Sequence, residues 1–139
     1  MTEPYLPVGT AKVFVNELSE GFWDACRRAE LTVQCCRFCG HYQHPPRVGC
    51  ANCQGDDLYW ARVPGTGVVY SYTIVHHGIG ELAAYVPFTI VVVELDESGT
   101  RLVSNLVGVP PDSVTVGLRV MVTWQDTGEF VIPRFRPAR

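Results

Sequence analysis

The sequence predicts a mainly β protein that begins with a helix, continues into a small cysteine-rich module and ends in a small closed β-barrel. Three observations lead to this fold class. Apolar residues recur at three- and four-residue spacing near the N-terminus, which is the period of an amphipathic helix. Two Cys-x-x-Cys pairs follow, and then come five or six short strand-like runs separated by turn residues, which favour a barrel over β-α-β units. We therefore divide the chain into an arm and helix (1–30), a cysteine module (31–59) and a barrel (60–139).

The composition is that of a globular protein with a hydrophobic core, since 47% of the 139 residues are hydrophobic. A net charge of −3 and a pI of about 5.7 disfavour a nucleic-acid-binding surface, which is usually basic. No apolar stretch approaches the roughly 20 residues that a membrane helix needs. The first residues lack the basic start and apolar stretch of a secretory signal. We expect a cytoplasmic protein with no membrane segment.

The helix is expected over residues 17–29. Asn16 is a candidate cap, and Glu17 and Glu20 would lie in the first turn, where negative charge suits the helix dipole. The apolar stripe consists of Leu18, Phe22, Ala25, Cys26 and Ala29. This stripe predicts that the helix docks by one face, with Cys26 as a small buried hydrophobic residue.

Four cysteines have the spacing of a zinc ribbon: Cys36, Cys39, Cys50 and Cys53. Each Cys-x-x-Cys turn can place two thiolates on one side of an ion, and two such turns complete the tetrahedral shell that Zn²⁺ prefers. Gly40 directly follows one pair, where a positive φ closes the turn. Because four sulfurs leave no open position for water, we expect a structural and not a catalytic zinc ion.

Other residues near these pairs offer alternative ligands. Cys35 precedes Cys36 and would form a less favourable Cys-x3-Cys pair, so we expect it to be a bystander. His41 and His44 lie between the two pairs and would be needed only if an imidazole replaced a thiolate. With four cysteines present, we interpret both histidines as surface residues.

Short strands are expected at 60–63, 68–77, 88–95, 101–107, 119–124 and 130–135. In the second run the residues alternate, with Tyr70 and Tyr72 on one face and Val69 on the other. The run from Phe88 to Leu95 is nearly all apolar, which predicts a strand buried on both faces. The terminal arginines, Arg134, Arg136 and Arg139, favour a solvated tail over a phosphate-binding site.

We find no catalytic residues in a motif-like arrangement. His76 and His77 end a predicted strand and either could act as a general base. No serine, cysteine or carboxylate accompanies them at a recognisable spacing, so a strand-end histidine is the simpler interpretation. A free-standing enzyme that uses one of these histidines remains an alternative, to be tested by turnover of the isolated chain.

The order of these features resembles the DUF35 family, whose members join a rubredoxin-like zinc ribbon to an OB-fold barrel. The resemblance covers about residues 17–137. This sequence departs from the family pattern at one position, where Cys35 replaces the Arg that such sequences usually carry. The motifs that carry it are Leu31-Thr-Val-Gln-Cys-Cys-Arg-Phe-Cys-Gly40, Pro45-Pro46, Cys50-Ala-Asn-Cys53, Gly65-Thr-Gly67, Val69-Tyr-Ser-Tyr-Thr-Ile-Val-His76, Pro87-Phe88, Val93-Glu-Leu-Asp96, Val116-Gly117 and Phe135-Arg-Pro137.

The resemblance implies a non-catalytic accessory subunit of thiolase-superfamily enzymes that act on acyl-CoA esters. Family members pair with acyltransferases or with retro-aldolases that shorten steroid side chains, and in some systems the domain is fused to a MaoC-like hydratase. The thiolase-like partner holds the catalytic residues and binds most of the CoA ester. We therefore expect a hetero-oligomer that acts in steroid catabolism.

The segment 78–87 is the expected contact with that partner. Its apolar side chains, among them Ile79, Leu82 and Tyr85, are poorly suited to water, so we expect a partner to cover them, with His76 and His77 at the rim. The alternative function is a single-stranded nucleic-acid-binding OB-fold protein, whose barrel would stack bases on exposed aromatic residues. The acidic net charge disfavours that alternative.

Overall fold

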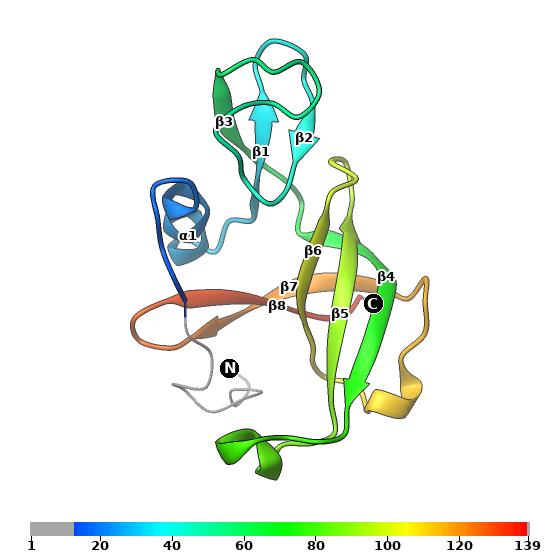
Figure 1. The fold of residues 1–139 in the computed structure, drawn as a ribbon. Coiled ribbons are helices and arrows are strands. Elements are labelled where there is room, and N and C mark those ends of the chain that lie inside the picture. The colour runs from blue at the N-terminus through cyan, green and yellow to red at the C-terminus, as the bar shows by residue number, and fades with distance from the viewer. Residues whose placement is uncertain (1–12, 139) are drawn as a thin grey trace.

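A computed structural model describes residues 13–138 of the chain, so most of the predicted N-terminal arm and Arg139 lie outside the described residues. A three-stranded sheet forms one end of the molecule, a closed five-stranded barrel forms the other, and a helix lies beside their junction (Figure 1). This architecture confirms the predicted fold class. The elements in chain order are α1 (Glu20–Arg27), β1 (Thr32–Cys36), β2 (Tyr42–Gln43), β3 (Leu58–Arg62), β4 (Thr66–Val75), η1 (Gly80–Ala84), β5 (Phe88–Leu95), β6 (Arg101–Leu106), η2 (Pro111–Ser113), β7 (Arg119–Asp126) and β8 (Val131–Pro137).

Helix α1 is shorter at both ends than the predicted helix over 17–29. The side-chain oxygen of Asn16 accepts hydrogen bonds from the N–H groups of Leu18 and Ser19, both at 3.0 Å. Asn16 therefore closes a turn ahead of the helix, and Ser19 occupies the N-cap position. At the other end Ala29 adopts a left-handed φ of 56°, which ends the helical path.

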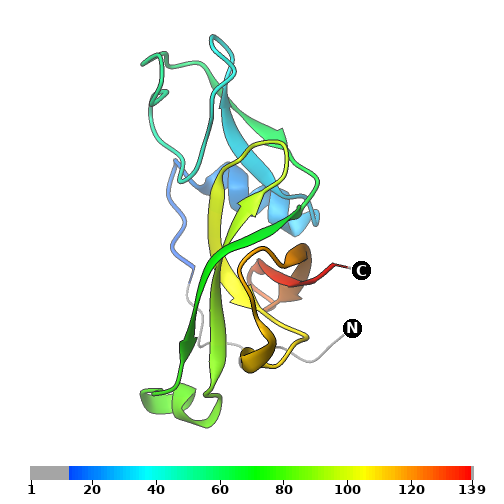
Figure 2. The same cartoon turned by 90° about the vertical axis from the view of Figure 1, so that its right-hand side faces the viewer.

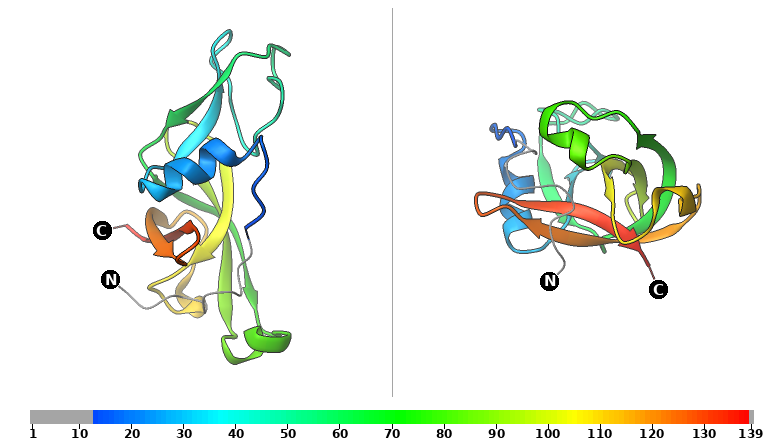
Figure 3. Two further views of the ribbon diagram at one scale, coloured as in Figure 1. Left: turned by 90° about the vertical axis from the view of Figure 1, so that its left-hand side faces the viewer. Right: turned by 90° about the horizontal axis from the view of Figure 1, so that it is seen from below.

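The helix contacts both the three-stranded sheet and the barrel. The Trp23 ring meets the Phe130 ring in the β7–β8 turn edge to face, with centroids 6.1 Å apart. On its other side Phe22 lies 5.8 Å from the ring of His44 and 6.4 Å from the ring of Trp60. Figure 3 shows α1 between the two parts. The helix therefore contacts both parts through aromatic side chains. Of the predicted apolar stripe, Phe22, Ala25 and Cys26 are buried, whereas Leu18 and Ala29 are exposed, and Trp23, which makes the barrel contact, was not part of that stripe.

The three-stranded sheet has the order β2-β1-β3, with β1 antiparallel to both neighbours. One of its outer strands, β3, contains residues 60–62 of the run 60–63, which the sequence led us to count as the first strand of the barrel. The structure instead pairs Trp60 with Gln34 of β1. A strand-like run carries no information about which sheet it joins, so the sequence pattern could not separate these alternatives.

The barrel has the strand order β4-β5-β6-β8-β7 and closes where β7 pairs with β4. Its seam between β6 and β8 is parallel and has one register pair, Leu106 with Phe135. The hydroxyl of Ser104 adds a 2.7 Å hydrogen bond to the carbonyl oxygen of Pro133 across this seam. The barrel interior is filled by branched aliphatic residues around the fully buried Phe135, namely Val69, Val91, Val93, Leu95, Leu102, Leu106, Val114 and Val120.

A β-bulge in β4 makes the predicted alternation of this strand wrong. The pairing with β5 shifts between Val69 and Ser71, which leaves Tyr70 as the extra residue. Val69 pairs with Val93 and is 1% exposed, while beyond the bulge Tyr72 pairs with Val91 on the same face. Tyr72 therefore shares a face with Val69 and not with Tyr70.

Two further sequence interpretations need correction. Strand β5 has the predicted bounds, but buried and half-buried residues alternate along it, so one of its faces is only partly covered. Arg134 does not belong to a solvated tail, since it is 8% exposed. Its guanidinium donates to Gln125 of β7 at 3.0 Å and to Asn105 of β6 at 2.7 Å. Within residues 13–138, no helix has the length and apolarity that crossing a membrane requires.

Candidate functional site

The four predicted ligand sulfurs converge at the far end of the three-stranded sheet. The Sγ atoms of Cys36, Cys39, Cys50 and Cys53 all lie within 4.8 Å of one another. The Cys36–Cys53 and Cys39–Cys50 sulfur pairs are each 3.6 Å apart. Four sulfurs at this mutual distance surround a space suited to one tetrahedral ion, and thiolates are the ligands that Zn²⁺ accepts most readily. The cluster is a candidate metal site.

The two cysteine turns have the same backbone geometry. Gly40 N donates to the carbonyl of Cys36 at 2.9 Å, and Gln54 N donates to the carbonyl of Cys50 at 2.9 Å. Both donor residues adopt left-handed φ values, 77° for Gly40 and 64° for Gln54. The sequence indicated the first position through its glycine. It missed the second, because Gln54 is not a residue type that signals a positive φ.

The pKa values of Cys39 and Cys53 are shifted in opposite directions by hydrogen bonds and by the neighbouring sulfurs. The amide of Asn52, 3.5 Å from Cys39 Sγ, is the main cause that lowers the pKa of Cys39 to about 6. The N–H of Gly55 lowers the pKa of Cys53, but contacts with the neighbouring sulfurs outweigh it and raise the pKa to about 12. Four thiolates this close repel one another, so the fully ionised cluster fits a site that binds a divalent cation.

The remaining cysteines lie outside the cluster. Cys35 is buried, and its sulfur, which is not part of the cluster, lies 3.6 Å from the carbonyl oxygen of Gly40. Cys26 is fully buried against the core, and burial raises its pKa to about 12, as expected for an inert thiol.

Two buried glutamines hold the loop that carries the second cysteine pair. Gln34 of β1 and Gln43 of β2 are register partners, and Gln43 Nε2 donates to Gln34 Oε1 at 2.6 Å. Gln34 also bonds the backbone N–H and carbonyl of Arg47, both at 2.9 Å. Gln43 bonds the carbonyl of Gly49 at 3.1 Å and the N–H of Ala51 at 2.9 Å. The sequence analysis did not identify either side chain as part of the site. Their position beside the cysteine turns is visible in the sequence, but their burial and their hydrogen bonds to the loop are not.

Neither ribbon histidine belongs to the sulfur cluster. His41 and His44 are both half-buried, so neither is the fully exposed surface residue that we expected, and His44 packs against Phe22 of α1. This burial lowers the pKa of His44. His44 also lines a cavity of about 270 Å³ between helix, ribbon and barrel, together with Trp23 and Arg134.

The segment 78–87 forms the tip of the β4–β5 hairpin, which projects away from the three-stranded sheet (Figure 2). Ile79 is 82% exposed and Tyr85 is 42% exposed, whereas Leu82 is half-buried. His76 and His77 are both exposed at the start of this segment. The structure therefore brings all five predicted interface residues to one end of the molecule.

The glycines of this tip serve a fixed geometry. A Cβ on Gly78 would lie 2.6 Å from the carbonyl carbon of Leu82 and 2.7 Å from the N of Ala83. Gly80 adopts a left-handed φ of 61°. Both positions need glycine for the 3₁₀ turn η1 to fold back on the end of β4.

A four-sulfur ribbon joined through a helix to a closed five-stranded barrel defines the class: zinc-ribbon OB-fold proteins. Residues 23–58 match the family described as "ChsH2, rubredoxin-like zinc ribbon domain", and residues 60–125 match "ChsH2, C-terminal OB-fold domain". The chain belongs to the DUF35 family.

Known proteins similar to this chain include enzyme subunits and a scaffold. A solved structure described as "Ltp2-ChsH2(DUF35) aldolase" superposes with a TM-score of 0.85 at 36% identity, covering 92% of this chain and 100% of that chain. The "DUF35 domain-containing scaffold protein" of Methanothermobacter thermautotrophicus is 30% identical over 74% of this chain and 77% of its own length. The "3-oxo-4,17-pregnadiene-20-carboxyl-CoA hydratase alpha subunit" of Mycobacterium tuberculosis is 32% identical over 84% of this chain. This chain spans 36–37% of the length of the hydratase alpha subunits that it matches.

Proposed function

We propose that this chain is a non-catalytic accessory subunit that binds and stabilises a thiolase-superfamily enzyme acting on acyl-CoA esters. The partner we favour is a retro-aldolase that shortens steroid side chains. In this assembly the partner supplies the catalytic residues and most of the CoA-ester contacts. The complex would be a cytoplasmic hetero-oligomer.

The observation that carries this proposal is the structural match to the aldolase chain, which this chain covers completely at a TM-score of 0.85. The steroid assignment is supported by the name of the mycobacterial relative, which denotes a steroid carboxyl-CoA. An accessory role agrees with the scaffold name of the archaeal relative.

The four-cysteine cluster would hold a structural Zn²⁺. Its ligands would be Cys36, Cys39, Cys50 and Cys53, whose sulfurs are within 4.8 Å of one another. Bound zinc contributes folding free energy and would fix the two cysteine turns against β1 and β2. The chain's own glutamines, Gln34 and Gln43, orient the loop that presents the second pair.

The hairpin tip would be the surface that meets the partner. Ile79, Leu82 and Tyr85 form its apolar part, and His76 and His77 form its rim. Support comes from the exposure of Ile79 and Tyr85 in a turn whose backbone is held by Gly78 and Gly80. A preorganised apolar tip loses little conformational entropy when a partner covers it.

Co-purification tests this function. The tagged chain is isolated from its native host, the bound protein is identified by mass spectrometry, and the complex is assayed for cleavage of steroid acyl-CoA esters. We expect a thiolase-like chain, and activity in the complex that neither subunit has alone. A partner of another class, or none, would contradict the proposal, and salt-sensitive submicromolar binding of an oligonucleotide would favour the nucleic-acid alternative.

A matched pair of double variants tests the tip. Replacing Leu82 and Tyr85 by Asp should weaken the complex by a few kcal/mol, because it buries unpaired charges at an interface. The control replaces Val103 and Val116, which are 66% and 67% exposed elsewhere on the barrel, by Asp. If both double variants form the complex as well as wild type does, with zinc content unchanged, the tip is not the interface.

A further inference from the structure

The sulfur cluster has a buried side and an exposed side. Cys36 and Cys50, the first cysteine of each pair, are 1% and 3% exposed. Cys39 and Cys53, the second of each pair, are exposed. Solvent, chelators and oxidants therefore reach the cluster through two of its four sulfurs.

Each exposed sulfur has a side chain from the opposite cysteine turn beside it. Asn52, from the second turn, directs its Nδ2 at Cys39 Sγ at 3.5 Å. Phe38, from the first turn, lays its ring edge on Gly55, next to Cys53. A Cβ built on Gly55 would collide with Phe38 Cδ2 and would lie 3.2 Å from Cys53 Sγ.

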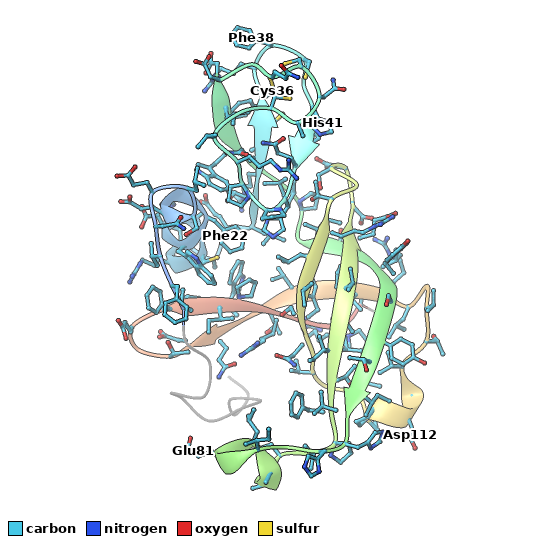
Figure 4. All side chains as sticks on the ribbon, in the orientation of Figure 1. Phe22, Cys36, Phe38, His41, Glu81 and Asp112 are labelled. Carbon is cyan, nitrogen blue, oxygen red and sulfur yellow. The ribbon has the colours of Figure 1, made fainter. Side chains whose placement is uncertain are left out.

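Phe38 is otherwise poorly placed, since it is 67% exposed at the outermost end of the ribbon (Figure 4). The backbone beneath it is anchored: Arg37 N donates to the carbonyl of Asp57 at 2.9 Å, and the Arg37 guanidinium stacks on Tyr59 at 4.4 Å. These contacts hold the backbone of the first turn against the start of β3, and the Phe38 ring lies next to Gly55 of the second turn.

We propose that Phe38 and Asn52 are reciprocal covers of the two exposed ligand sulfurs and that they set the rate at which the cluster loses its metal. This inference rests on the proposed zinc site. Phe38 would restrict the approach of water and chelators on the Cys53 side, and Asn52 would hold Cys39 by donating a hydrogen bond to its sulfur. Because each side chain crosses from one cysteine turn to the other, the pair also resists separation of the turns.

Metal transfer to a chromophoric chelator, 4-(2-pyridylazo)resorcinol, tests the inference on the full chain. The zinc content of each purified protein is measured first, and then the rate of zinc transfer is followed by absorbance. Phe38→Ala and Asn52→Ala should each release zinc about 10-fold faster than wild type, the size of effect typical of side chains that support metal ligands. Phe38→Leu, which retains an apolar cover, should be intermediate.

Phe14→Ala is the matched control, because Phe14 is 85% exposed and lies outside the ribbon. It should release zinc at the wild-type rate. A wild-type chain that binds no zinc would refute the proposed metal site. Stoichiometric zinc with equal release rates for wild type, Phe38→Ala and Asn52→Ala would refute the covers and leave the metal site standing. The covering role of Phe38 would also be refuted if Phe38→Ala releases zinc at the wild-type rate but binds the partner enzyme more weakly. Phe38 would then be an interface residue.

Discussion

The guanidinium of Arg119 on β7 forms a two-pronged ion pair with the carboxylate of Asp96, which follows β5. Arg119 Nη1 donates to Oδ1 at 3.0 Å and Nη2 donates to Oδ2 at 2.6 Å. The Thr66 hydroxyl, on β4, also donates to Oδ2 at 2.6 Å. One carboxylate thus ties together three strands at the place where the barrel closes.

Acid should weaken this closure. The Arg119 hydrogen bonds, with that of Thr66, lower the pKa of Asp96 to about 2. An unfolded aspartate has a pKa of about 3.9, so the pair stabilises the fold above about pH 4 and loses its contribution as the pH falls toward 2. The pair is largely exposed to solvent, which screens it, so we expect a small but measurable coupling energy at pH 7.

The measurement is a double-mutant cycle with Asp96→Asn and Arg119→Met. The free energy of unfolding of each protein is measured by chemical denaturation at pH 7 and below pH 3. The cycle cancels acid effects shared by all four proteins, including loss of metal. A coupling energy that does not shrink in acid would show that Asp96 ionisation is not its source.

The ligand assignment predicts opposite outcomes for neighbouring cysteines. Cys39→Ser should lose zinc and lower the soluble yield, because metal binding supplies folding free energy. Cys35→Ser should keep one zinc per chain, since its sulfur points to the carbonyl of Gly40. Metal analysis of both variants decides the assignment, and equal zinc loss in the two would make it wrong.

Gln43 should matter to the metal site although it is not a ligand. Gln43→Ala removes bonds to Gln34, Gly49 and Ala51 and leaves buried polar groups without their partner. We expect a loss of about 1–3 kcal/mol in the free energy of unfolding and weaker zinc binding. Denaturant unfolding and competition with a chelator measure the two effects. Gln54→Ala, at an exposed position, is the control, because Gln54 contributes only its backbone.

Gly21 tests how tightly α1 packs on the ribbon. Helix propensity alone predicts that Gly21→Ala stabilises by about 1 kcal/mol. A Cβ there, however, would lie 2.8 Å from Trp60 Cε2 and closer still to other atoms of the indole. We expect overpacking to dominate, with a net loss of about 1–3 kcal/mol.

Repeating the substitution in a Trp60→Leu background separates the two effects. Without the indole, Gly21→Ala should become neutral or stabilising in thermal or denaturant unfolding. Destabilisation of equal size in both backgrounds would show that the close approach to Trp60 is not the cause.

The sequence predicted those features that depend on local pattern. The bounds of β5 follow from an apolar run that ends in the turn at Asp96, and the cysteine spacing indicated the four sulfurs that the structure brings together. Features that depend on contacts with residues distant in the chain could not be predicted from the sequence. The bulge at Tyr70 reassigns a face through pairing with β5, and burial of Arg134 depends on Asn105 from β6. No residue type near these positions signals either outcome.

The parallel seam of the barrel also orders events during synthesis. All four cysteines and the three ribbon strands are present once the ribosome has passed Arg62. The barrel, in contrast, is complete only when β8 lies between β6 and β7, so it cannot form before its last strand has been made. The nascent chain thus has all its metal ligands before β5 is made, and the apolar residues of β5 then lack their enclosure until β8 follows, a state in which chains are prone to aggregate. A chain released after β7 would hold every zinc ligand and have no closed barrel.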